Sequence, residues 1–150
     1  MNLTILQTEL NTDPVNLGYA ALISSGYDQS IADLLNNISG AGAAPIQLNV
    51  QPRGDFLISL LPAVNALSSA SADLQSKWDR LLQVACSNDS IAVGSPAIKA
   101  VLDAAAQDGI ITTDQRASIG MRIGSRAEVL LGAGTIIVHQ QIAQILRGTN

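Results

Sequence analysis

The sequence predicts a mainly α-helical fold, a compact bundle of short helices with an extended arm or short β segment near residues 44–52. Apolar residues recur at helical spacing along most of the chain, and residues suited to begin or end helices divide that pattern into short pieces. A clear strand-like alternation of apolar and polar residues occurs at 46–50. With 150 residues, the chain has the size of one domain. We therefore expect a single helical domain over 1–150, with 39–54 as a flexible or extended arm or linker.

The first part of the chain predicts three short helices. Leucines within residues 3–10 share one helical face, and Pro14 ends that helix because the residue before a proline is pushed out of the α region. A brief helical stretch over 15–23 follows. Asp28 is then suited to cap a third helix, whose apolar residues over 31–38 follow the i, i+3, i+4, i+7 spacing.

The segment that follows is the candidate arm. It begins rich in Gly, Ala and Ser, continues with the alternating residues 46–50, and is closed by Pro52 and Gly54. A lone short strand is not stable unpaired. Two alternatives remain open: an ordered loop within the chain, or an arm that adds to the sheet edge of a neighbouring chain.

The middle of the chain predicts two helices of different quality. Residues 55–61 are strongly apolar, and Pro62 interrupts or ends the helix that they begin. The best helical pattern covers 71–86, where Trp78 lies in the apolar stripe and is interpreted as a core anchor. Cys86 comes late in this helix, and we expect a small buried thiol there.

A further helix is predicted to begin where Ser95 precedes Pro96, because serine at the cap with proline in the first turn is a strong start signal. Gly109 ends it. Lys99 and Asp103 are spaced to form an outer i, i+4 pair on this helix. The next helix is expected to start at one of the threonines at 112 and 113 and to run to about residue 121.

The end of the chain predicts two short capped helices in tandem. Ser125 with Glu128 three residues later is a capping-box pattern, in which the hydroxyl and the carboxylate each accept a backbone N–H of the first turn. Gly132 gives the chain freedom to turn. Apolar residues over 138–146 then recur at helical spacing before Gly148, a natural C-terminal cap.

Composition narrows the classes of function. Only 13% of residues are charged while 47% are hydrophobic, which favours a surface partly covered by other subunits and hence a homo-oligomer; an alanine-rich monomer is the alternative. The net charge of −4 argues against nucleic acid as a partner, because phosphate neutralisation needs a basic field. No run of about 18 apolar residues predicts a membrane span.

The sequence predicts no enzyme, and it offers no catalytic, cofactor-binding or metal-binding residues. Cys86 is the only cysteine and His139 the only histidine, so there is neither a disulfide nor a cysteine-based metal cage. We interpret His139 as structural or solvated. A triad of these two residues with an aspartate lacks any supporting sequence context. No cofactor is expected.

We predict interface residues in the candidate arm and among the arginines near the end of the chain. The candidates are Ile46, Leu48, Val50, Arg53, Arg116, Arg122 and Arg126. The last three arginines are interpreted as a solvated or interface set. A less favoured alternative is a helix-turn-helix regulator, in which a second helix after Gly109 would carry Arg116 and Arg122; it lacks a cluster of base-reading side chains.

Motifs at both ends of the chain resemble a family of uncharacterised tailed-bacteriophage proteins encoded among virion genes. At the start these are Thr12-Asp13-Pro14, Gly18-Tyr19-Ala20 and Ala32-Asp33-Leu34-Leu35-Asn36. At the end they are Ser125-Arg126-Ala127-Glu128, Leu131-Gly132, Thr135 to Val138, and Leu146-Arg147-Gly148. The chain departs from the family at Leu130-Leu131, where a phenylalanine is usual, and residues 39–55 match only loosely.

The resemblance implies a non-catalytic structural protein of the virion, assembled in the cytoplasm of the bacterial host. An oligomeric adaptor in the neck between head and tail, or in the tail, is the favoured position, and a minor capsid-associated or decoration protein is the alternative. Its partners would be further copies of itself and neighbouring head or tail proteins. Arg126 is the residue of the Ser-Arg-Ala-Glu motif that a helix cap does not require, so it is the first candidate there for a contact with a neighbouring subunit.

Overall fold

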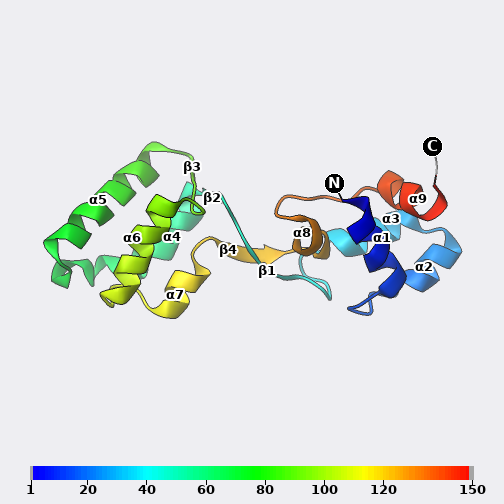
Figure 1. Cartoon of the computed structure of the whole chain (residues 1–150), viewed down its shortest axis with the longest axis horizontal. Helices are drawn as coiled ribbons and strands as arrows, with labels where there is room; N and C mark the ends of the chain where they lie inside the picture. Colours follow the sequence, from blue (N-terminus) through cyan, green and yellow to red (C-terminus); the bar gives the residue numbers. More distant parts are fainter. Residues whose placement is uncertain (1, 149–150) are drawn as a thin grey trace. The chain divides into compact units, whose positions relative to one another are not determined.

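The computed structural model of the chain describes residues 2–148 and confirms a mainly α-helical protein with short two-stranded sheets (Figure 1). The sequence predicted one helical domain, whereas the residues cluster into two compact units, each with its own core. Unit 1 combines the two ends of the chain, up to Ile46 and from Ile123 onward. Unit 2 is the continuous segment Gln47–Arg122.

Unit 1 is a group of short helices from both ends of the chain. Its helices are α1 (Leu3–Thr12), α2 (Tyr19–Ser25), α3 (Asp28–Asn36), α8 (Arg126–Leu131) and α9 (His139–Arg147). The helix α3 packs against both α8 and α9, so the core joins residues from opposite ends of the sequence. Its buried residues include Leu6, Tyr19, Ile31, Leu35, Ala127 and Ile142. As predicted, Gly148 caps the last helix in the left-handed conformation, at φ 58°.

The strands at the boundary between the units pair with each other. β1 (Ala44–Gln47) and β4 (Met121–Gly124) form a two-stranded sheet. A Cβ atom at Gly124 would come within 2.6 Å of the Ile46 side chain, so glycine permits the close approach of the two strands there. The extended segment thus starts two residues before the predicted 46–50 and pairs within the chain. The segment is thus ordered within the chain, as a paired strand and not as a loop, and its addition to the sheet edge of a neighbouring chain stays a prediction.

Unit 2 is built around three longer helices. Its elements are β2 (Gln51–Pro52), α4 (Arg53–Val64), the 3₁₀ turn η1 (Leu67–Ser69), α5 (Ala72–Ser87), β3 (Ser90–Ile91), α6 (Pro96–Gln107) and α7 (Thr113–Ser118). β2 and β3 pair antiparallel, with Gln51 opposite Ile91. Trp78 is 1% exposed in the core among residues of α4, α5 and α6, which confirms the prediction of an anchor.

Two predicted helix ends are wrong. α4 continues through Pro62 to Val64; a proline this close to the end of a helix removes only one hydrogen bond and leaves little helix beyond it to disturb. The helix predicted to reach residue 121 stops at Ser118, because Gly120 turns the chain at φ +79° into β4. The Gly120 carbonyl accepts the Leu48 N–H at 2.7 Å, a non-local bond that no local pattern reveals.

Two side-chain predictions are also wrong. Cys86 is exposed, because Ala85 occupies the buried position on α5 and the next residue of a helix points about 100° away. Asp103 does not pair with Lys99. Instead, its carboxylate accepts from Arg116 Nε at 2.6 Å, so the ion pair joins α6 to α7.

Adjacent leucines in α4 test the assignment of the core. Leu60 is 1% exposed and Leu61 is 62% exposed. We expect Leu60→Ala to lower the free energy of unfolding by about 2–5 kcal/mol, because it leaves a cavity in the core of unit 2. Leu61→Ala, the matched control, should change it by no more than about 0.5 kcal/mol in dilute solution. Urea unfolding followed by Trp78 fluorescence measures both, and equal losses would contradict the burial of this face.

Candidate functional site

The apolar candidates for an interface have separate settings. Ile46 packs at Gly124 in unit 1, and Leu48 is partly buried against the core of unit 2. Val50 is 53% exposed. Ile46 and Leu48 therefore contribute to the packing of the fold. Of these three candidates, Val50 is the one whose apolar side chain is mostly exposed.

The arginine candidates in unit 2 are also distributed. Arg116 pairs with Asp103, and Arg53 Nη1 donates to the Cys86 carbonyl at 3.4 Å. Arg122 lies in β4, outside α7, which is only six residues long. A helix after Gly109 that carries both Arg116 and Arg122 is therefore absent, and the helix-turn-helix alternative loses its geometric basis.

Arg126, the candidate in unit 1, forms a buried ion pair with Glu9. Its Nε and Nη2 atoms donate to the two carboxylate oxygens of Glu9 at 2.8 and 2.7 Å. Glu9 is 3% exposed and also accepts from the Tyr19 hydroxyl at 3.3 Å. Donation of its hydrogen bonds to Glu9 raises the pKa of Arg126, while burial and the neighbouring Glu9 carboxylate raise the pKa of Tyr19. Sequence reasoning missed this pair, because its members are 117 residues apart.

The predicted capping box is present in full. Ser125 Oγ accepts the Glu128 N–H at 3.3 Å, and Glu128 Oε2 accepts the Ser125 N–H at 3.1 Å. The other carboxylate oxygen of Glu128 accepts the Gly134 N–H at 2.7 Å, which also fixes the loop after α8. Glu128 is buried. This confirms that it serves the fold.

Two further polar contacts tie α3 to the end of the chain. Asp28 accepts two hydrogen bonds from Arg147, at 2.6 and 2.7 Å. The amide of Asn36 donates to the Ile137 carbonyl at 2.7 Å and accepts the Ile137 N–H at 2.9 Å. The motifs at the two ends of the sequence therefore meet in unit 1, where their polar groups bond to one another and to the backbone.

The described residues contain no group of three or more His, Cys, Asp or Glu side chains placed to hold a metal ion. Cys86 ends up exposed near the end of α5 in unit 2, and His139 is exposed as the first residue of α9 in unit 1. Within residues 2–148, no helix combines the length and the apolar character needed to cross a bilayer.

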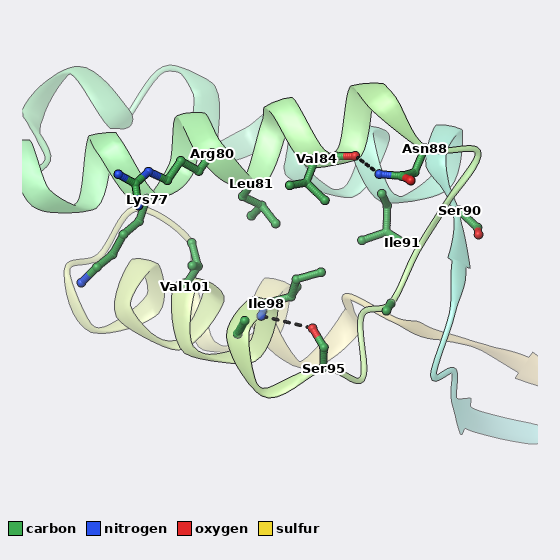
Figure 2. Close-up of a pocket in the computed structure, with 12 residues that line it drawn as sticks. Lys77, Arg80, Leu81, Val84, Asn88, Ser90, Ile91, Ser95, Ile98 and Val101 are labelled. Carbon is green, nitrogen blue, oxygen red and sulfur yellow. Dashed lines mark hydrogen bonds between the residues drawn. The ribbon is translucent and has the colours of Figure 1, made fainter.

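Unit 2 contains an apolar groove between α5 and α6, which we call the α5–α6 groove (Figure 2). Its volume is about 500 Å³. Aliphatic side chains face into it from both helices and from β3: Leu81, Val84, Ile91, Ile98 and Val101. Lys77 and Arg80 lie at one end, and Asn88, Ser90 and Ser95 lie toward the other. The sequence pattern of α5 predicted its buried stripe but not this partly open space beside it.

A second apolar surface, which we call the α4 ridge, lies on the outer face of α4. Ile58, Leu61 and Val64 are 65%, 62% and 53% exposed. They are spaced by three residues and form a row along the helix, whereas Phe56 and Leu60 point into the core. The apolar run was evident in the sequence. The sequence did not show which side of this apolar run remains exposed.

Comparisons of the chain with protein families, with curated proteins and with solved structures find no match. The features of the chain that bear on its function are therefore the two apolar surfaces of unit 2 and the polar network of unit 1.

The Glu9–Arg126 pair makes a strong prediction about stability. Arg126→Ala leaves a buried carboxylate without its counter-charge, and we expect the free energy of unfolding near neutral pH to fall by about 3–5 kcal/mol. Glu9→Gln combined with Arg126→Met should recover part of this loss, since no uncompensated charge remains. Urea unfolding followed by circular dichroism measures the effect. Lys77→Ala is the control: its pair with Asp73 is exposed, and the loss should stay below about 1 kcal/mol. Equal losses for Arg126→Ala and Lys77→Ala would contradict this role.

The Asp28–Arg147 pair predicts a dependence on pH. The hydrogen bonds from Arg147 lower the pKa of Asp28 in the folded protein. The stabilisation by this ion pair is therefore fully present above the pKa of Asp28 in the unfolded chain, about 3.9. It is lost as the pH falls through the lower pKa of Asp28 in the folded protein. We expect Asp28→Asn to be less stable than the wild type at neutral pH, and the difference to shrink as acid protonates Asp28. Thermal unfolding of both proteins across an acid-to-neutral pH series measures it, and a difference independent of pH would contradict the assignment.

Proposed function

We propose that this chain is a non-catalytic structural protein of a tailed bacteriophage virion, an oligomeric adaptor in the neck or tail. The observation that carries the proposal is the α4 ridge, whose three aliphatic side chains are each more than half exposed. Scattered exposed apolar residues are ordinary, but a continuous row on one helix is typical of a protein contact surface.

The α5–α6 groove adds support, because it is a second apolar surface on the same unit. A protein that is part of a larger assembly contacts more than one neighbour, so it needs more than one such surface. The low fraction of charged residues, 13%, agrees with a surface that is partly covered in the assembled state.

Unit 1 supports the proposal through the residues that carry the family resemblance. Asp13 accepts the backbone N–H groups of Leu17 and Gly18, Ser125 and Glu128 cap α8, and Arg126 neutralises Glu9. Their hydrogen-bonding capacity is directed at the fold itself. The fold therefore accounts for these motif residues, and this favours a structural role in an assembly over a catalytic role.

The alternative within the same class is a minor capsid-associated protein. It differs from an adaptor in copy number, because a ring in the neck or tail contains a small, fixed number of subunits and a capsid lattice contains many more. Both positions need exposed contact surfaces, so the surfaces alone do not discriminate between them.

Purified particles of the phage that encodes this chain provide the test. We expect quantitative mass spectrometry to find the chain in the virion at the copy number of a ring, measured relative to the portal protein. A protein encoded by the same phage that does not enter the particle serves as the control for contamination. A copy number comparable with that of the major capsid protein would favour the capsid alternative, and absence from purified virions would contradict the proposal.

A further inference from the structure

We propose that the α4 ridge of one copy of this chain lies in the α5–α6 groove of the next copy. This inference rests on the proposed function as an oligomeric adaptor and specifies the contact through which the oligomer forms. Both surfaces belong to unit 2, so the contact is defined within one compact unit of each copy.

The ridge has the chemistry of an insert. Beyond Asp55, no residue of α4 is charged, so Ile58, Leu61 and Val64 can enter an apolar environment without the desolvation of an ionised group. The opposite face of the helix is held by its own core, where Phe56 and Leu60 are buried. The ridge therefore points away from the unit that carries it.

The groove has the chemistry of a receptor. Val84 on its α5 wall is 50% exposed, and Ile98 and Val101 on its α6 wall are partly buried. Figure 2 places these aliphatic side chains between the two helices, with the polar residues toward the ends. A row of aliphatic side chains from a third helix would cover them and exclude water, which is the main source of favourable free energy in such contacts.

The lengths of the two surfaces match. From Asp55 to Val64 a helix rises about 13.5 Å, and from Arg80 to Asn88 it rises about 12 Å. An α4 helix parallel to α5 of the neighbouring copy would therefore span the groove from its basic end to its amide and hydroxyl end.

Charge fixes the direction of insertion. Asp55 is exposed in the first turn of α4, one turn before Ile58. Arg80 is exposed at the basic end of the groove, and within residues 2–148 it has no ion-pair partner, unlike Lys77, which pairs with Asp73. Arg53, the other charged residue of α4, donates to the Cys86 carbonyl of its own chain. Asp55 of one copy and Arg80 of the next are complementary, and the reverse orientation would leave Arg80 opposite an apolar helix end.

Because the ridge and the groove are different surfaces, the contact is heterologous. After two copies dock, one free ridge remains on one copy and one free groove on the other, so the assembly continues until it closes as a ring or extends as a filament. A ring is the form that an adaptor in the neck or tail requires.

The experiment uses the full chain and two exposed positions, so that the fold is retained. Leu61→Asp disables the ridge, and Val84→Asp disables the groove. Sedimentation velocity over a concentration series should find oligomers for the wild type and association weakened by about tenfold or more for either variant, as expected when an interface anchor is lost. Ile38→Asp, a change at a residue of unit 1 that is 58% exposed, is the matched control and should associate like the wild type. Circular dichroism and Trp78 fluorescence verify that each variant is folded.

Mixing the variants separates this contact from a symmetric one. The Leu61→Asp protein retains a groove and the Val84→Asp protein retains a ridge, so an equimolar mixture should form one-to-one dimers that grow no further. In a symmetric ridge-to-ridge contact the mixture would form no such dimer. The charge pair is tested in the same way: Asp55→Lys and Arg80→Glu should each weaken association, and the two changes in one chain should restore it.

The outcomes distinguish this inference from the proposed function. Wild-type chain that stays monomeric throughout the series, or variants that assemble like the wild type, would overturn the ridge-to-groove contact. Either result would leave the virion assignment to be decided by the copy-number measurement. Absence of the chain from virions, together with the expected pattern of mixing, would overturn the proposed function and leave the contact between copies supported.

Discussion

The buried ion pair between Glu9 and Arg126 is the interaction on which unit 1 depends most. It joins Glu9 of α1 to Arg126, which begins α8 117 residues further along the chain, and both carboxylate oxygens of Glu9 are occupied by the guanidinium. A carboxylate that is 3% exposed is tolerated only with such a partner, because burial of an isolated charge is strongly unfavourable. The two ends of the sequence are therefore interdependent. The capping box of α8 is part of the same constraint, since it fixes the first turn from which Arg126 projects.

The two units of the chain differ in the interactions that characterise them. In unit 1, polar motif residues from both ends form hydrogen bonds to one another, to Glu9 or to the backbone. In unit 2, the core is formed by one continuous segment, and two apolar surfaces remain on its outside. Polar contacts thus connect the two ends of the chain in unit 1, whereas unit 2 carries the α4 ridge and the α5–α6 groove.

Local signals in the sequence predicted the parts of the fold that depend on local physics. Ser125 with Glu128, Ser95 before Pro96 and the stripe around Trp78 each predicted a helix that is present, because caps and periodicity act within one or two turns. Other features depend on partners distant in sequence. Gly120 ends α7 so that β4 can pair with β1, Asp103 turns to Arg116, and Arg126 is bound by Glu9. The candidate surfaces were missed for the same reason, because an apolar run does not reveal which of its faces the rest of the fold covers.

The interleaved order of the two units has a consequence for synthesis on the ribosome. The core of unit 2 is complete once Arg122 has been added, whereas the core of unit 1 still lacks Ala127, Ile137 and Ile142 at that point. Chains are made from the N-terminus, and compact units generally fold as they emerge. The first helices, and Glu9 among them, therefore lack their core partners and Arg126 until these later residues have been made. The core of unit 1 can therefore be completed only after α9 has been made, whereas that of unit 2 needs no residue beyond Arg122.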